Sequence, residues 1–331
     1  MTAGDHPYTY RDSYISLVLG SVTETTRACS GRRRQAALPT PEDHAMNTTP
    51  ATGRQTVMTE PSLEMTGKDK DIESLREAAP AIPQGTRINV TFLGNEDLSM
   101  RVKASTAARD LGFVPVPHIS ARRLTSRAEL EEFLTALREQ VGATHAFSVG
   151  GDPSEPMGPY ASSLDVIQTG LFKDHGFTDV SIAGYPEGHP DISEGQLWDA
   201  LERKNASLKE QGLNGTILTQ FGFDVDPIVH WIEEVRRRGV DLPIRVGVPG
   251  PAGIKRLLTY ASRFGVSTSA GIAKKYGFSL TNLLGTAGPD KLITALDQAM
   301  TPAHGDVKLH FYTFGGMRAT AEWIAEYQRK H

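Results

Sequence analysis

The stretch GTILTQFGFDVDPIVHWIEEVRRRGVDLPIRVGVPG, residues 215–250, joins two short apolar runs through one amphipathic segment. The outer runs, 215–223 and 243–250, have the length and composition of buried strands. The middle run has a proline in its first turn and repeats apolar residues at helical spacing. The residues on its apolar face are Ile228, Trp231, Ile232 and Val235. The stretch therefore predicts a strand, a crossover helix and a second, parallel strand.

The same alternation recurs along the chain from about residue 62. The strand-like runs are 62–66, 87–93, 113–120, 145–151, 179–186, 215–223, 243–250 and 308–314. Eight such units match a (β/α)8 TIM barrel, which typically has about 250 residues. The rival is an open doubly wound sheet, which usually carries a G-x-G-x-x-G loop after its first strand, and SLEMTGKDKD lacks that loop. We therefore predict the barrel, with two extra helices in the long connection 251–307.

The first 60 residues have a different composition, rich in Ser, Thr, Pro and Arg and without an apolar period. Such a segment does not bury enough apolar surface to order itself. It is either a flexible tail or a stretch ahead of a later start at Met46 or Met58. We predict a disordered tail over 1–58 and a barrel catalytic domain over 59–331.

Composition excludes several classes of protein. The 331 residues carry a net charge of −4, which indicates no nucleic-acid partner. No apolar run reaches the roughly 20 residues that span a bilayer, so we expect no membrane partner. The single cysteine, Cys29, rules out an intramolecular disulfide and is compatible with a cytoplasmic location. The oligomeric state is open, and a homo-oligomer is compatible with the sequence.

Polar residues follow the predicted strands at their carboxyl ends, where barrel proteins carry their chemistry. These residues are Glu64, His118, Asp152, Tyr185, Glu187, His189, Gln220, Asp224 and Tyr312. Each one alone also has a structural explanation, as a solvated charge, a core histidine or a strand cross-link. The histidines lie on separate strands and neither H-E-x-x-H nor G-x-S-x-G occurs, so we predict no metal and no serine triad.

Four motifs give the chain a recognisable pattern. VGGDP (149–153), GPYASSLD (158–165), AGYPEGHPD (183–191) and ILTQFGFD (217–224) occur in that order, with SLEMT and PHIS before them. Together they resemble the methylenetetrahydrofolate reductase family, over about residues 60–331. The resemblance implies FAD as cofactor, NAD(P)H as co-substrate and 5,10-methylenetetrahydrofolate as substrate. It implies reduction to 5-methyltetrahydrofolate by ping-pong hydride transfer, in one-carbon metabolism.

The resemblance also implies roles for individual residues. Glu64 is the expected general acid, since protonation of N10 opens the imidazolidine ring of the substrate. Asp152 is expected beside the flavin and the pterin, as a second catalytic residue that also binds both. Gln220 and Tyr312 are expected to bind the substrate together with Glu64 and Asp152. The expected FAD-binding residues are His118, Gly150, Gly151, Asp152, Tyr160, Ala161, Ala183, Tyr185, His189 and Lys204.

Other interpretations remain open. One is a divergent, flavin-free reductase of the same family. Another is a TIM-barrel lyase or aldolase without a redox cofactor, which would usually need a Schiff-base lysine or metal ligands at its strand ends. The last is a folate- or flavin-binding protein without catalysis.

Overall fold

The computed structural model describes residues 56–263 and 286–331 and contains a closed barrel of eight parallel strands. The strand order around the barrel is β1-β10-β7-β6-β5-β4-β3-β2. The barrel strands are β1 (Ser62–Met65), β2 (Arg87–Val90), β3 (Val114–Ser120), β4 (His145–Val149), β5 (Asp179–Gly184), β6 (Asn214–Phe221), β7 (Ile244–Pro249) and β10 (Val307–Tyr312). All eight predicted strands are present, and the predicted (β/α)8 TIM barrel is confirmed.

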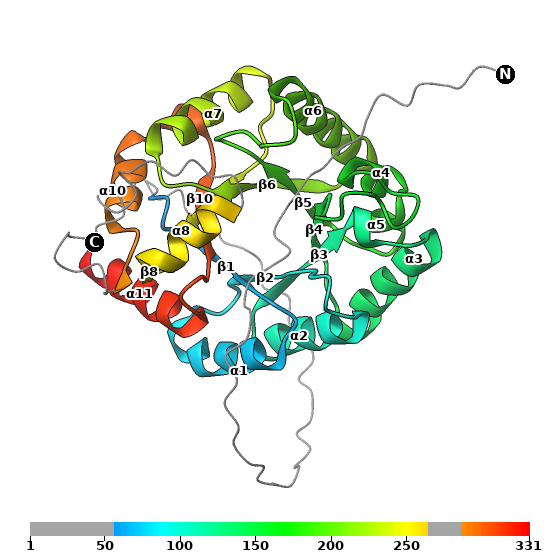
Figure 1. Ribbon diagram of the computed structural model, residues 1–331, viewed down its shortest axis with the longest axis horizontal. Helices are drawn as coiled ribbons and strands as arrows, with labels where there is room; N and C mark the ends of the chain where they lie inside the picture. The colour runs from blue at the N-terminus through cyan, green and yellow to red at the C-terminus, as the bar shows by residue number, and fades with distance from the viewer. Residues whose placement is uncertain (1–55, 264–285) are drawn as a thin grey trace, which may run out of the picture. The chain divides into compact units, whose positions relative to one another are not determined.

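Helices form a ring outside the strands, except for the helix Ile254–Arg263, which lies over the opening of the barrel (Figure 1). They are α1 (Asp69–Ala78), α2 (Leu98–Asp110), α3 (Arg127–Ala136), α4 (Ser163–Gln168), α5 (Leu171–Asp174), α6 (Glu194–Gln211), α7 (Val225–Arg237), α8 (Ile254–Arg263), α10 (Asp290–Ala299) and α11 (Met317–Lys330). The two extra helices predicted for 251–307 are α8 and α10. The same connection also contains a two-stranded sheet, formed by β8 (Ala252–Gly253) and β9 (Thr286–Ala287).

Local signals in the sequence account for several of these elements. The Ser126 hydroxyl accepts a hydrogen bond from the Glu129 N–H at 3.1 Å and so caps the start of α3. The π-helical turn that follows α3 ends at Gly142, whose φ of 72° lies in the left-handed region. The apolar face predicted for 226–240 is the buried face of α7.

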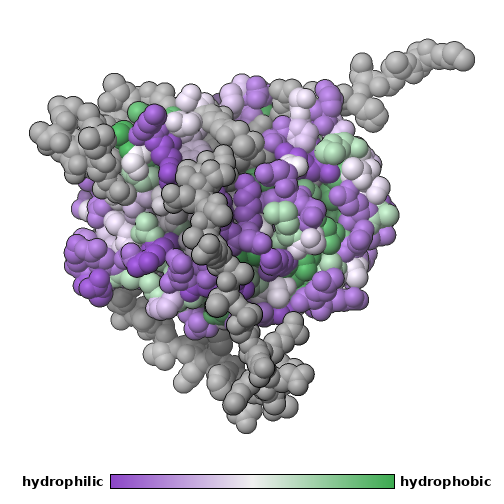
Figure 2. Space-filling view, turned by 60° about the horizontal axis from the view of Figure 1, so that its bottom comes forward, coloured by the Kyte–Doolittle hydropathy of each residue, from purple (hydrophilic) through white to green (hydrophobic). Residues whose placement is uncertain are grey.

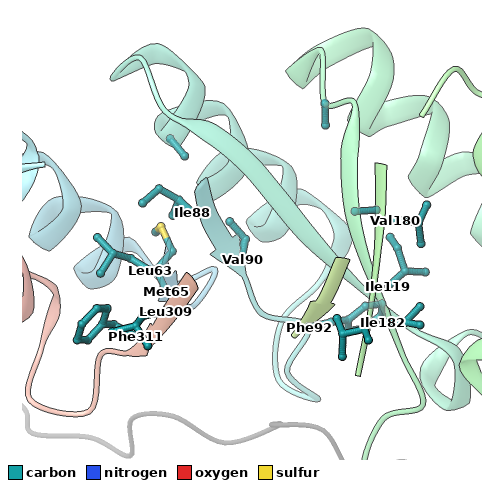
Figure 3. Close-up of a cluster of buried hydrophobic side chains, with 14 of the residues drawn as sticks. Leu63, Met65, Ile88, Val90, Phe92, Ile119, Val180, Ile182, Leu309 and Phe311 are labelled. Atoms are coloured by element: carbon teal, nitrogen blue, oxygen red, sulfur yellow. The ribbon is translucent and has the colours of Figure 1, made fainter. Parts of the chain in front are cut away.

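The strands separate two environments because successive side chains point to opposite faces. Outward side chains pack against the helices and form the main hydrophobic core, part of which Figure 3 shows. The core residues labelled there are Leu63, Met65, Ile88, Val90, Phe92, Ile119, Val180, Ile182, Leu309 and Phe311. Inward positions are largely polar yet buried: Ser62, Glu64, Asn89, His118, Ser181, Thr216, Gln220, Arg245 and His310. The inside of this barrel therefore combines buried polar groups with a few apolar ones, such as Phe147 and Leu218.

Hydrophilic residues cover most of the described surface visible in Figure 2. In the described ranges no helix is long and apolar enough to cross a membrane. Val57 and Met58 are buried in the core, and the Val57 N–H donates to Asp297 at 2.9 Å. Packing thus begins before the boundary predicted at residue 58, while the rest of the predicted tail, 1–55, lies outside the described residues.

Candidate active site at the carboxyl end of the barrel

Glu64 is the buried acid of the barrel interior. It sits on β1 between the outward residues Leu63 and Met65, and its exposure is 3%. Its Oε2 atom has no hydrogen-bond partner among the described residues. Burial without compensating donors disfavours the carboxylate and raises the pKa of Glu64 to about 8. At neutral pH the side chain is therefore mostly a carboxylic acid that holds a proton.

Two buried histidines face the same oxygen. Nε2 of His118 on β3 lies 3.8 Å from Glu64 Oε2, and Nε2 of His310 on β10 lies 3.7 Å from it. Burial lowers the pKa of His118 to about 3 and that of His310 well below its ordinary value. The pKa order means that the proton stays on the carboxyl group while both imidazoles remain neutral.

Each histidine is held by a polar neighbour on an adjacent strand. The Ser62 hydroxyl lies 3.0 Å from His310 Nδ1, and the Asn89 amide nitrogen lies 3.4 Å from His118 Nε2. The sequence analysis included His118 and missed His310. The alternation in KLHFYTF could have found it, because His310 lies between the outward residues Leu309 and Phe311. Within 56–263 and 286–331, no three His, Cys, Asp or Glu side chains are arranged to hold a metal ion.

Asp152 belongs to a second polar group on the same rim. Its carboxylate forms an ion pair with Arg123, and the Asp152 side chain is 31% exposed. The Arg123 guanidinium packs against Gly94, where a Cβ atom would come within 2.4 Å of Arg123 Nη1. The negative charge of Asp152 is thus partly balanced by a cation that the motif VGGDP does not reveal.

The two glycines before Asp152 have different contacts. Gly151 has a φ of +96°, and a Cβ atom there would lie 2.1 Å from the Ser120 hydroxyl oxygen. Only glycine satisfies both the backbone angle and the close approach. The carbonyl oxygen of Gly150 accepts a hydrogen bond from the Arg122 N–H at 2.8 Å. The turn is therefore fixed to the segment that follows β3.

Arg122 shapes the loop that contains the motif GPYASSLD. Its buried guanidinium donates to the carbonyl oxygens of Pro153 at 2.8 Å, Ala161 at 3.0 Å and Ser154. Tyr160 on this loop is buried within the main hydrophobic core. Arg122 is thus a structural residue here, a role that sequence alone does not distinguish from that of a solvated arginine.

The residues predicted around β5 lie close together on its carboxyl end and the following loop. Ala183 and Tyr185 are buried, and the rings of Tyr185 and His189 meet edge to face at 5.4 Å. Nδ1 of His189 accepts a hydrogen bond from the Asp191 N–H at 3.1 Å. Lys204 lies on α6, the helix after this loop, and is 2% exposed. The structure therefore positions this set on a single strand–loop–helix unit.

Gln220 and Tyr312 lie at the same end of the barrel, and the side chain of each already makes a hydrogen bond within the protein. The side-chain oxygen Oε1 of Gln220 accepts a hydrogen bond from the Phe221 N–H at 3.1 Å. The Tyr312 hydroxyl is fully buried and donates to the Thr219 carbonyl at 3.0 Å. Tyr312 therefore presents its ring rather than its hydroxyl to the site.

Helix α8 covers part of this end of the barrel. Arg256 donates to the Phe314 carbonyl at 2.9 Å, and the Tyr260 ring stacks on the Phe314 ring at 4.2 Å. Phe314 directly follows β10, so the long connection after β7 reaches the rim where Glu64 lies.

The fold is a closed parallel barrel, and a protonated acid and two neutral histidines lie at its carboxyl end. These features place the chain in the class of (β/α)8-barrel proteins that have an acid–base site at the strand ends. The family model for methylenetetrahydrofolate reductase matches residues 61–326. The chain therefore belongs to the methylenetetrahydrofolate reductase family, and the resemblance found in the motifs is confirmed.

Individual relatives match over shorter stretches. A 5,10-methylenetetrahydrofolate reductase of Pectobacterium carotovorum subsp. carotovorum is 29% identical over 178 residues, covering 53% of this chain and 57% of the relative. A probable methylenetetrahydrofolate reductase (NADH) of Oryza sativa subsp. japonica is 28% identical over 132 residues, covering 36% of this chain and 22% of the relative. The chain thus spans about a fifth to just over half of these proteins.

The similarity to solved structures is weaker. A dihydropteroate synthase from Thermus thermophilus shares 14% identity at a TM-score of 0.44, covering 83% of this chain and 96% of that chain. That similarity is too low to support an inference about function.

Proposed function

We propose that the chain is a flavin-dependent reductase that converts 5,10-methylenetetrahydrofolate to 5-methyltetrahydrofolate with NAD(P)H. The observation that carries the proposal is the buried Glu64, whose pKa is raised to about 8 by burial. Opening the imidazolidine ring requires a proton on N10, and a general acid is most effective when its pKa lies near the working pH. Family membership favours this reaction over a lyase or aldolase.

Several buried polar atoms support the proposal that FAD binds at this end of the barrel. Ser120 Oγ, Arg123 Nε and Asn205 Oδ1 are buried and make no hydrogen bond with the described residues. Gly151 leaves bare backbone beside Ser120. A ligand rich in donors and acceptors would satisfy such atoms. When bound, FAD would supply the relay of a hydride from NAD(P)H to the folate.

The side chains of the chain have distinct tasks in this proposal. Glu64 gives its proton to N10 of the folate, the C–N10 bond breaks, and an N5 iminium results, whose methylene carbon accepts the hydride. Burial keeps that proton on Glu64 until substrate arrives, and the lowered pKa values of His118 and His310 prevent these imidazoles from taking it. Asp152, held by Arg123, and Gln220 orient the amino edge of the pterin, since an amide and a carboxylate offer matching acceptors.

Binding of the cofactor is tested by refolding the protein with FAD and measuring flavin absorbance and fluorescence after removal of free ligand. Lys204→Met should weaken FAD binding at least about tenfold, since a buried ammonium on α6 is suited to a phosphate. Arg203→Met, which removes an exposed charge one residue earlier in α6, is the matched control and should bind FAD normally. A protein that takes up no FAD yet reduces the folate with NAD(P)H would establish the flavin-free alternative.

A further inference from the structure

A cavity of 470 Å³ lies at the amino end of the barrel. Its walls include the first residues of several strands, among them Asp179 and Ile244, so it lies at the opposite end from Glu64. Four basic residues line it: Arg87, Lys209, Arg245 and Lys308. The amino end of a barrel is ordinarily a stability face, and a buried arginine there, Arg245, calls for a physical reason.

Arg87 and Arg245 are the two arginines among these basic residues, and the distances to their partners show how each is held. Arg87 on β2 donates to the Thr216 hydroxyl on β6 at 3.4 Å, and these strands lie four apart in either direction around the barrel. Arg245 is 7% exposed and donates to the Glu60 carbonyl oxygen at 2.9 Å. In the described part of the chain neither guanidinium forms an ion pair with a carboxylate. Each has five N–H donors, so most of its donors are available to the cavity.

Three acids, Asp179, Asp241 and Asp306, also line the cavity, and two of them have basic neighbours. Asp179 accepts from the Thr178 hydroxyl at 2.8 Å and lies 3.7 Å from His145. Lys308 binds the Glu60 carboxylate at 2.6 Å and lies 4.0 Å from Asp306. Burial, and then repulsion by Arg87, lowers the pKa of Arg245 to about 10. Asp306 and Glu60 act on the pKa of Arg245 in the opposite direction. The amino-end cavity thus holds two neighbouring guanidinium groups, the buried Arg245 and the half-buried Arg87, and neither makes an ion pair within 4 Å among the described residues.

We infer that this cavity binds a phosphate-type oxyanion, either free or on a small metabolite, between Arg87 and Arg245. The planar fork of arginine pairs in bidentate fashion with such oxyanions, and a buried cation gains most from a hydrogen-bonded counter-ion. The inference concerns the end of the barrel away from the folate site and does not depend on the proposed reductase activity.

Isothermal titration of the full chain with inorganic phosphate, at constant ionic strength set by chloride, tests the inference. We expect saturable binding that Arg87→Gln weakens at least about tenfold, the loss typical of a charge-assisted hydrogen bond. Arg127→Gln removes an equal charge from the exposed surface of α3 and should leave binding unchanged. Arg87→Lys retains the charge without the fork and should give an intermediate affinity.

A second titration tests at which end of the barrel the phosphate binds. Because the proposed FAD site also accepts phosphates, the titration is repeated with FAD present, and binding at the amino end should persist. Abolition of phosphate binding by FAD, full binding by Arg87→Gln, or no binding by the unmodified chain would each overturn the inference. Loss in Arg87→Gln with persistence beside FAD would support it, whatever the reductase assays show.

Discussion

Nε2 of His118 lies 3.8 Å from Oε2 of Glu64, and both side chains are almost completely buried. A charged pair at this separation would attract, yet the pKa of Glu64 is raised to about 8 and that of His118 is lowered to about 3. Desolvation thus outweighs attraction for this pair, as it often does in a protein interior. The stable form at neutral pH is an uncharged acid beside an uncharged base.

Glu64→Gln should separate two halves of the proposed reaction. Oxidation of NAD(P)H requires no proton on N10, so flavin bleaching should proceed at nearly the normal rate. Reoxidation by methylenetetrahydrofolate should slow by about 10²–10⁴-fold, the usual contribution of a general acid. Stopped-flow absorbance measures both halves.

Glu96→Gln is the matched control for that experiment. Glu96 is also a buried acid, but it accepts hydrogen bonds from the Gly67 N–H at 2.8 Å and the Leu93 N–H at 3.1 Å. Its loss should lower stability without changing the ratio of the two half-reactions. Equal slowing of both halves in Glu64→Gln would assign Glu64 a structural role.

The same Glu64→Gln variant should alter the pH dependence of stability. A carboxyl whose pKa is raised to about 8 on folding is fully stabilising below its ordinary pKa of 4.5, and this contribution is lost as pH rises toward 8. The wild type should therefore lose stability relative to Glu64→Gln across this window, by up to about 1.4 kcal/mol per pH unit. Urea denaturation at several pH values gives the difference, and parallel profiles would contradict the raised pKa.

His118→Gln should change the profile on the acid side instead. The pKa of His118 falls from 6.5 to about 3 on folding, so the wild type loses stability as pH drops through this range. The substitution removes that loss and should make the acid limb shallower. An unchanged acid limb would indicate that His118 is protonated in the folded protein.

Gly151→Ala should cost more stability than the same change at another glycine with positive φ. Gly85 has a φ of 78° with no atom within 4 Å of the added Cβ, so Gly85→Ala incurs only backbone strain of about 1–2 kcal/mol. At Gly151 the new Cβ would also meet the Ser120 hydroxyl at 2.1 Å, adding about 1–3 kcal/mol. Adding Ser120→Ala should recover part of that excess. Equal losses at the two glycines would show that Ser120 moves aside freely.

Two truncations should differ although they end only five residues apart. Removal of 1–55 should change the melting temperature little, as the composition of this segment predicts. Removal of 1–60 also deletes the buried Val57 and Met58 and the contacts of Glu60 with Arg245 and Lys308. We expect a fall of several degrees for the longer deletion, measured by calorimetry, and equal melting temperatures would contradict the packing of Val57.

Local patterns predicted the elements of the fold because each pattern acts within a few residues. Short apolar runs predicted the strands, and apolar residues at helical spacing predicted α7. The run 87–93 was predicted too long: β2 ends at Val90, and the Leu93 N–H turns to the Glu96 carboxylate. That difference depends on a side chain three residues beyond the run.

The partners of the candidate site were harder to predict because they meet through space. Arg123 reaches Asp152 from a different strand end, and His310 reaches Glu64 over an interval of more than 240 residues. A single sequence gives no measure of such long-range pairing. The side-chain alternation in the last strand was the one usable signal for His310.

The partly polar barrel interior has a consequence for how this protein can change. Its main apolar core lies between strands and helices, outside the compartment that holds Glu64, His118 and His310. We therefore expect substitutions at the polar inward positions to alter the chemistry of the site while the apolar contacts between strands and helices remain. New reactivity can therefore be introduced inside the barrel by mutation or by design, while the apolar layer between strands and helices continues to stabilise the fold.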